Sequence, residues 1–395
     1  MRIAILNAGH MTRGGTERVV AHQARELNAR GHQVRIFVPY ARKGVFGAVI
    51  PREVTIDSWG KRFSLPGIGA SFNRLLHFWS GVSKLAFFDL LIAHNQPAPY
   101  AAYKTRKNLH IPYLVYVHGP WRRLYPRKID VATGWTGGVK SRVVGASQAY
   151  WKRIDRASMV AASGVLTNSH HTKKEVEALY GVPSTVCYPG ADASEYPDVT
   201  EIAEEVALRY DIDEYTILLV GRHVPQKKLE WIPQILREVS DEIPYAKFLI
   251  TGRATRYTQT MLKEAERRGV RRRLILAGEV AEKELLAFYH LCPVLCSVAV
   301  EEEFSLTPIE AMAGGCVPIA WNEAGPAETI KNGVDGFLVS PYDLAQMAGL
   351  ISTLLTDREM REHMGMRGRE KAGSFTWKRH ADILEEAIRQ AVVRH

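Results

Sequence analysis

The chain opens with MRIAILNAGHMTRGGTERVVAHQARELNARGHQVRIFV, residues 1–38, and this stretch decides the fold class. Ile3 to Asn7 form a short apolar run, which is typical of a buried β-strand. Residues 14–30, which begin GGTE, follow a helical pattern, and Gly31-His32 end it before a second apolar run from Val34 to Val38. A strand, a helix and a second strand in this order predict a β-α-β unit with parallel strands.

The same alternation continues along the whole chain. Further apolar strands are expected at Phe87–Ala93, Tyr113–Val117, Val165–Asn168, Thr216–Val220, Lys247–Thr251, Leu274–Ala277, 294–300 and Val317–Ala320. At 395 residues the chain exceeds what a single hydrophobic core usually supports. We therefore predict an α/β protein with two Rossmann-like, doubly wound domains that face each other across a cleft.

The predicted domain boundaries follow the composition. The segment YPGADASEYPD, residues 188–198, mixes proline, glycine and acidic residues and indicates a hinge. We assign residues 1–195 to an amino-terminal domain, 196–213 to the hinge and 214–373 to a carboxyl-terminal domain. Residues 374–395 contain a last helix, which we expect to pack back on the first domain.

The composition is that of a folded, globular protein. Hydrophobic residues make up 46% of the chain and charged residues 24%, so a disordered chain is not expected. The amino terminus reads as a strand rather than a signal peptide, and no run approaches the roughly 20 apolar residues that cross a bilayer. The four cysteines lack zinc-site spacing and are expected to be buried thiols. We expect a cytoplasmic protein, peripheral at the inner membrane face.

The net charge of +10 is concentrated in one segment. Between Lys104 and Arg156 lie twelve Lys or Arg but only two Asp. The same segment contains the aromatic residues Trp121, Tyr125, Trp135, Tyr150 and Trp151. Basic and amphipathic aromatic side chains together favour an anionic partner, such as a membrane surface, a phosphorylated lipid carrier, an acidic glycan or nucleic acid. The alternative is a solvated surface with scattered aromatics.

Residues 302–314, EEFSLTPIEAMAG, place two carboxylates around the start of a helix. Glu302 is expected in a loop, and Glu310 about two turns into a helix that begins near Pro308. A helix start offers free N–H groups and a positive dipole to an anion, whereas carboxylates accept hydrogen bonds from sugar hydroxyls. The pattern favours a sugar that carries a phosphate. The alternative is an ordinary charged loop followed by an amphipathic helix.

A pair of cations complements these acids. In GRHVPQK, residues 221–227, Arg222 and Lys227 leave a turn that follows a predicted strand. Two cations beside the helix start at Ser305 would hold a diphosphate and stabilise it as it leaves with negative charge. Such a turn alone is more often an ordinary charged loop, but the glycine-rich AGPAE at 324–328 in the same half favours a phosphate site.

In this order the motifs resemble the retaining, nucleotide-sugar-dependent glycosyltransferases of family 4, whose fold is called GT-B. The resemblance covers nearly the whole chain and rests on GGTE at 14–17, RGHxV at 30–34, HGP at 118–120, YPGAD at 188–192, GRx4K at 221–227, Ex7E at 302–310, GPAE at 325–328 and NGxxGFLV at 332–339. It implies transfer of a mannose, glucose or N-acetylglucosamine type hexose to a glycan or lipid-linked acceptor.

The resemblance also implies roles for the residues of the second half. Arg222 and Lys227 would bind the donor diphosphate, Glu302 the hydroxyls of the transferred sugar, and Glu310 the hydroxyls of the ribose. The donor would be a GDP- or UDP-sugar. Members of this family generally need no metal ion, so we expect no cofactor.

Further residues enter through the same match. His118 would lie near the sugar and complete a catalytic set with Arg222, Lys227 and Glu302. The backbone at Gly14 and Gly15 would approach the donor phosphate and the acceptor. The amides near Leu306 and Thr307 would complete the phosphate cradle.

The sequence departs from the family at the acidic loop, which commonly reads EGFG. Glu303 and Ser305 replace its two glycines here, which adds a carboxylate and restricts the backbone. The choice of sugar is therefore left open by the residues.

Three other functions remain as alternatives. A nucleotide-sugar epimerase has a similar two-domain architecture but needs no acceptor. A phosphorylase-like enzyme would require a pyridoxal cofactor. Nucleic-acid binding would follow from the positive charge, but the sequence shows no nucleic-acid-binding module, so we expect no nucleic-acid partner.

Overall fold

The computed structural model describes residues 1–8, 14–38, 49–58, 82–133, 140–191 and 199–393. The chain divides into two compact units. Unit 1 comprises Met1–Arg127, Gly134–Gly190 and Trp377–His395, and unit 2 comprises Lys128–Thr133 and Ala191–Thr376. The short segment Lys128–Thr133, which the sequence placed in the first domain, therefore groups with unit 2.

Unit 1 is built on a parallel sheet, which has seven strands among the described residues, in the order β3-β2-β1-β4-β5-β6-β7. The strands are β1 (Arg2–Asn7), β2 (Gln33–Val38), β3 (Thr55–Ser58), β4 (Leu90–His94), β5 (Tyr113–Val117), β6 (Gly164–Thr167) and β7 (Thr185–Val186). The strand order reverses between β1 and β4. In open parallel sheets ligands bind at the carboxyl ends of the strands near such a reversal.

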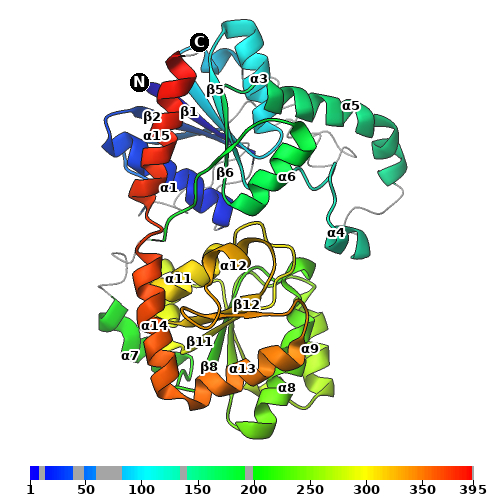
Figure 1. Cartoon of the computed structure of the whole chain (residues 1–395), viewed down its shortest axis with the longest axis vertical. Coiled ribbons are helices and arrows are strands. Elements are labelled where there is room, and N and C mark those ends of the chain that lie inside the picture. Colours follow the sequence, from blue (N-terminus) through cyan, green and yellow to red (C-terminus); the bar gives the residue numbers. More distant parts are fainter. Residues whose placement is uncertain (9–13, 39–48, 59–81, 134–139, 192–198, 394–395) are drawn as a thin grey trace. The chain divides into compact units, whose positions relative to one another are not determined.

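Helices cover both faces of this sheet. They are α1 (Gly15–Ala29), η1 (Val82–Leu85), α3 (Ala98–Leu109), α5 (Lys140–Val160), α6 (His170–Tyr180) and α15 (Trp377–Val393). Successive residues of β1 point to opposite faces: Ile3 and Ile5 pack with residues of α1 and α15, whereas Ala4 and Leu6 pack with residues of α3 and α6. The carboxyl-terminal helix α15 packs against α1, which it crosses at an angle (Figure 1).

Unit 2 repeats the architecture with a parallel sheet that has six strands in the described chain, in the order β10-β9-β8-β11-β12-β13. The strands are β8 (Thr216–Val220), β9 (Lys247–Thr251), β10 (Leu274–Gly278), β11 (Val294–Ser297), β12 (Val317–Trp321) and β13 (Phe337–Val339). The helices and turns are α4 (Lys128–Ala132), α7 (Thr200–Arg209), η4 (Pro225–Lys227), η5 (Leu229–Trp231), α8 (Ile232–Glu242), α9 (Thr258–Arg267), η6 (Arg271–Arg273), α10 (Glu282–Leu291), α11 (Leu306–Gly314), α12 (Ala324–Thr329), α13 (Leu344–Thr356) and α14 (Arg358–Ala372).

The faces of the second sheet are also divided between two sets of helices. Ile217 and Leu219 of β8 pack with residues of α8 and α13, whereas Leu218 packs with residues of α7 and α10. Figure 1 shows α8 and α13 together beside this sheet. The prediction of an α/β protein with two doubly wound sheets is confirmed.

Some element boundaries differ from the prediction. The helix expected to begin near Pro308 begins at Leu306, so Glu310 is just over one turn from its start rather than two. The strand expected over 294–300 ends at Ser297. Among the elements that the sequence reading missed are β3, which is short, and α3, whose N-cap residue Pro97 makes no side-chain cap hydrogen bond. It also missed α13, although Asp343 caps that helix by accepting from the N–H of Gln346.

The four cysteines are buried free thiols, as predicted. Of the helices that the structure describes, none combines the length and the apolar character needed to cross a bilayer. In the basic segment, Trp135 lies outside the described residues.

Candidate active site

The turn that follows β8 is fastened to the loop that follows β11. The backbone N–H of Val300 donates to the carbonyl of Gln226 (3.0 Å). The Gln226 side-chain amide donates in turn to the carbonyls of Val300 and Glu301, both at 3.3 Å. These bonds hold two segments side by side at the carboxyl edge of the sheet. The residue after Gln226 is thereby brought next to the acidic loop.

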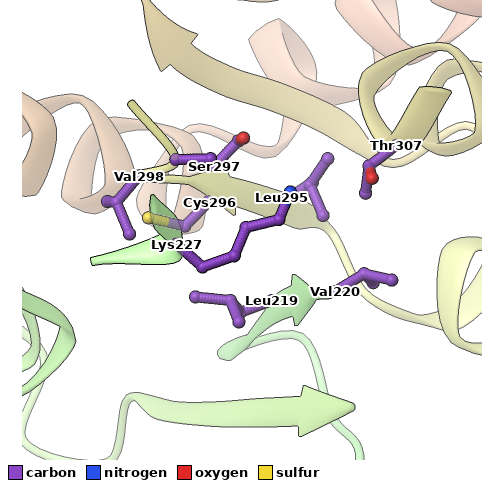
Figure 2. Close-up of a pocket in the computed structure, with 9 residues that line it drawn as sticks. Leu219, Val220, Lys227, Leu295, Cys296, Ser297, Val298 and Thr307 are labelled. Carbon is purple, nitrogen blue, oxygen red and sulfur yellow. The ribbon is translucent and has the colours of Figure 1, made fainter. Parts of the chain in front are cut away.

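That residue is Lys227, and it forms the central ion pair of the site. Its Nζ atom donates to Oε1 of Glu302 at 2.7 Å, and both side chains are largely buried. Figure 2 shows the Lys227 side chain crossing a small pocket between β8 and β11, with Thr307 at the pocket's far side. The structure therefore brings together Lys227, Glu302 and the start of α11.

Close packing against α12 sets the path of the acidic loop. A Cβ atom on Gly325 would lie 2.3 Å from Cα of Phe304, so only glycine fits at this contact. The Gly325 N–H also donates to the carbonyl of Glu302 (2.9 Å). On the other side of Glu302, the N–H of Ile129 in α4 donates to the Glu301 carboxylate (3.0 Å). The Glu302 carbonyl is therefore held by α12, and the side chain of the preceding residue is held by α4.

Ser305 gives α11 an unusual start. Its backbone lies in a positive-φ conformation (φ 59°, ψ 101°), which is strained for a residue with a side chain. The Oγ atom is buried, and it has no hydrogen-bond partner in the described chain. Leu306 and Thr307 follow as the first residues of the helix, so their N–H groups point out of its start without an intrahelical carbonyl. This arrangement can accept an anion.

Glu310 lies on the same helix and is only 8% exposed. The hydroxyl of Tyr289 in α10 donates to its Oε2 atom at 2.8 Å. This contact depends on Gly314, since a Cβ atom there would lie 2.7 Å from the backbone of Tyr289. The close approach of α10 and α11 therefore orients the Glu310 carboxylate.

Arg222 differs from the other predicted donor residues. It follows β8 directly after Gly221, in the same turn as Lys227, but its side chain is exposed. Its neighbour His223 is buried, with Nδ1 2.9 Å from Oγ1 of Thr258, and burial lowers the pKa of His223. Arg222 therefore takes no part in the ion pair of Lys227 and Glu302.

The remaining predicted residues belong to unit 1. Gly14 is the extended residue before α1, and Gly15 is the first residue of that helix. His118 follows β5 directly, at the carboxyl edge of the first sheet, and is partly buried. Its Nε2 atom lies 2.9 Å from Nδ1 of His94. Burial, together with repulsion from His380, lowers the pKa of His118 to about 3, so this imidazole is neutral.

The sequence reading missed the partners behind His118. His94 is fully buried at the end of β4, and it lies 2.9 Å from Gln23 of α1. Gln23 in turn lies 3.0 Å from His380 of α15. The only available signal was that His94 and His118 both follow apolar strands. Nothing in the sequence connects either residue with position 23 or 380.

The described residues contain no group of three or more His, Cys, Asp or Glu side chains that could hold a metal ion.

Two family models match the chain, one for each half. The model described as Glycosyltransferase Family 4 matches residues 13–195, and the model described as Glycosyl transferases group 1 matches residues 203–371. Together these matches extend over both sheets.

Individual proteins are similar over almost the full length. The D-inositol 3-phosphate glycosyltransferase of Nocardia farcinica (strain IFM 10152) is 23% identical over 396 residues, which cover 96% of this chain and 85% of that protein. The solved structure of the sucrose-phosphate synthase from Thermosynechococcus elongatus is 19% identical, covers 100% of both chains and has a TM-score of 0.80. The structure of Anabaena HepE in complex with UDP is 18% identical, covers 98% of this chain and 100% of the other, and has a TM-score of 0.77.

Proposed function

We propose that this protein, which belongs to the glycosyltransferases of group 1 and family 4 and has the GT-B fold, transfers a hexose to a glycan or lipid-linked acceptor. The donor is a nucleoside-diphosphate sugar, and the transfer retains the anomeric configuration. The observation that carries the proposal is the ion pair of Lys227 and Glu302 beside the start of α11. It sets opposite charges next to each other at the carboxyl edge of one sheet.

The chemistry of glycosyl transfer requires this arrangement of charges. The diphosphate gains negative charge as it departs, so cations and helix-start N–H groups stabilise it when they are already in place. Lys227 and Arg222 would supply the cations, and Ser305, Leu306 and Thr307 would surround the phosphates. The transferred sugar becomes positively charged at its anomeric carbon, which favours a carboxylate such as Glu302 nearby.

Glu310 and His118 would contact the two ends of the donor, the ribose and the transferred sugar. Glu310, oriented by Tyr289, would accept hydrogen bonds from the ribose hydroxyls. His118 would contact the sugar. The leaving phosphate would serve as the base for attack on the same face, so no enzyme nucleophile is required for retention. We also propose that no metal ion takes part, because the protein cations meet the leaving charge.

The nucleotide is proposed to be a uridine or guanosine diphosphate. Support for a nucleotide donor comes from the solved structures of similar fold, since Anabaena HepE was solved with UDP and with UDP-glucose. The acceptor is proposed to be held by unit 1.

The assay that tests the proposal uses UDP-glucose, UDP-N-acetylglucosamine and GDP-mannose as donors, with and without EDTA. Inositol phosphates, a sugar phosphate and an extracted lipid fraction serve as acceptors. Mass spectrometry detects the product, and the coupling constant of its anomeric proton gives the configuration. We expect a donor-dependent product with retained configuration that EDTA does not abolish. An altered sugar in the arm without acceptor would favour an epimerase, and absence of any donor turnover would contradict the proposal.

We also propose that the basic segment 104–156 docks on an anionic membrane surface and places the enzyme at the cytoplasmic membrane face. Tyr150 is 60% exposed on α5, and exposed Lys152 and Arg153 follow it on the same helix. Exposed aromatic and basic side chains are the combination that interfacial binding uses.

Vesicle flotation tests this docking. The triple variant Tyr150→Ser, Lys152→Glu and Arg153→Glu should lose binding to phosphatidylserine vesicles. The control is the double variant Lys263→Glu and Arg272→Glu, in which two exposed residues of unit 2 are replaced. It changes the net charge by the same amount and should leave vesicle binding nearly unchanged. An equal loss in both variants would show a general charge effect and contradict a dedicated surface.

A further inference from the structure

A buried chain of hydrogen bonds runs through unit 1 and ends at His118. Nδ1 of His380 lies 2.8 Å from the carbonyl oxygen of Tyr188, and Nε2 of His380 lies 3.0 Å from Nε2 of Gln23. Oε1 of Gln23 lies 2.9 Å from Nε2 of His94. Nδ1 of His94 lies 2.9 Å from Nε2 of His118. Four side chains from two strand ends and two helices are therefore linked in series.

The carbonyl of Tyr188 sets the direction of the whole series. A carbonyl oxygen can only accept a hydrogen bond, so Nδ1 of His380 must carry the proton. Burial lowers the pKa of His380 to about 4, so the ring is neutral and carries no second proton. Its Nε2 atom is therefore an acceptor, and it takes an N–H of the Gln23 amide.

The same logic passes along the remaining links. Because the Gln23 amide group faces His380, its Oε1 atom faces His94 and accepts from Nε2–H of that ring. Burial holds the pKa of His94 well below its usual range, so Nδ1 of the neutral ring is an acceptor. His118 must then donate from Nε2–H. Its Nδ1 atom is left with a lone pair.

The packing around the series keeps these rings in place. The ring of Tyr116 lies 5.2 Å from that of His94, 4.9 Å from that of His118 and 5.5 Å from that of His380, measured between centroids. The Tyr116 hydroxyl donates to the carbonyl of Cys187 (2.7 Å), so it does not compete for the imidazole nitrogens.

The open end of the series has the chemistry of a hydroxyl-binding group. His118 is partly exposed and follows β5 at the carboxyl edge of the sheet, where parallel sheets bind ligands. A lone pair accepts from a hydroxyl, whereas a phosphate oxygen offers only lone pairs of its own. We propose that Gln23, His94 and His380 are positioning residues that hold His118 in the Nε2–H tautomer, so that its Nδ1 atom accepts a hydrogen bond from a sugar hydroxyl. The identity of the ligand rests on the proposed glycosyl transfer.

Long-range 1H–15N correlation spectra of the ¹⁵N-histidine-labelled protein test the tautomers directly. Single His→Asn variants at positions 94, 118 and 380 assign the signals. We expect Nε2–H for His94 and His118 but Nδ1–H for His380, all neutral at pH 6. Nδ1–H on His118, or a protonated ring in the series, would overturn the proposal.

A matched pair of variants separates positioning from a purely structural role. Gln23→Met keeps the side-chain length but removes both hydrogen bonds, so His118 should show a mixture of tautomers. Turnover should fall by about 10- to 100-fold, the range found when the partner behind a metal-bound histidine is removed. The control Thr105→Val removes another buried hydrogen bond of unit 1, from Thr105 Oγ1 to the Ala101 carbonyl, and should leave the tautomers unchanged. A single Nε2–H tautomer of His118 in Gln23→Met would refute the positioning role.

The tautomer signals come from the free protein and do not require an identified substrate. If the tautomers are as expected but the protein transfers no sugar, the proposed function and the sugar hydroxyl as ligand are contradicted. The role of Gln23, His94 and His380 in positioning His118 would still stand. If Gln23→Met does not fold, the wild-type spectrum still decides the tautomer of His118.

Discussion

Lys227 donates a 2.7 Å hydrogen bond to Glu302, a residue 75 positions further along the chain. The pair neutralises a cation at the point where a diphosphate is proposed to bind. A bound phosphate would therefore compete with Glu302 for Lys227. This competition predicts that substitution of Glu302 strengthens the binding of a free nucleoside diphosphate but lowers turnover.

Glu302→Gln should bind free UDP or GDP about two- to fivefold more tightly while losing turnover. The amide removes the negative charge that competes for Lys227. An exposed ion pair is worth about 0.2–1 kcal/mol, and we take the upper part of this range for a pair that is largely buried. Isothermal titration calorimetry measures the affinity. Glu303→Gln removes the neighbouring charge and serves as the control. Weaker nucleotide binding by Glu302→Gln would count against the competition.

Lys227→Met should lower turnover by roughly 10²- to 10³-fold, the usual cost of removing one group that stabilises developing negative charge. The fold should be retained, because the side chain crosses a pocket and does not belong to the hydrophobic core of unit 2. Lys228→Asn is the matched control, since it removes the adjacent charge at a positive-φ position that Asn tolerates. Comparable losses in both variants would contradict a specific role for Lys227.

Glu310→Gln should lose the ability to distinguish UDP from 2′,3′-dideoxy-UDP. A carboxylate accepts hydrogen bonds from both ribose hydroxyls, whereas an amide can offer only one acceptor atom. Competitive inhibition by the two nucleotides measures the discrimination. Tyr289→Phe, which removes the partner of Glu310, should reduce the discrimination less. Unchanged discrimination in Glu310→Gln would place the ribose elsewhere.

Gly325→Ala should destabilise unit 2 and displace the acidic loop, because the new Cβ atom would lie 2.3 Å from the Phe304 backbone. Gly349→Ala is the control. It lies in α13 with open space around its Cβ position, and it should stabilise the protein by about 0.5–1 kcal/mol. Thermal unfolding gives both values. A Gly325→Ala protein of wild-type stability and turnover would show that the close contact does not shape the site.

His22→Phe should reduce the loss of stability in acid. His22 is 1% exposed, and burial, followed by the charges of Arg25, Arg18 and His380, lowers its pKa to about 2. In the unfolded chain histidine titrates near about 6.5, so below that pH only the unfolded state takes up this proton. The free energy of unfolding then falls by up to about 1.4 kcal/mol per pH unit.

Urea unfolding at pH 7, 6 and 5 checks this prediction. Phenylalanine preserves the stacked contact with Trp377, whose ring lies 4.1 Å from that of His22 between centroids. The variant should therefore gain stability relative to the wild type as the pH falls. A difference that stays constant across the three pH values would show that His22 does not remain neutral in the folded protein.

Local pattern was sufficient to predict most of the strands and part of the site. Most strands are apolar runs in sequence, although β3 and β7 are not. Parallel strands align their carboxyl ends, so residues directly after strands could be placed at one edge. Arg222 was located in this way, whereas His118 was assigned through the HGP motif shared with the family. Glu302 and Glu310 were found because both flank one helix start, where eight residues of local sequence fix their spacing.

Contacts between distant segments were decided only by the tertiary structure. Lys227 meets Glu302 because Gln226 bonds the loop after β11, and His118 acquires its tautomer from residues of α1, β4 and α15. Such contacts depend on packing between elements whose separation in the chain carries no periodic signal. Burial then determines which of these groups stay neutral. Local sequence thus specifies which chemical groups stand at the strand ends, and packing between distant elements specifies which of these groups touch and in which protonation state.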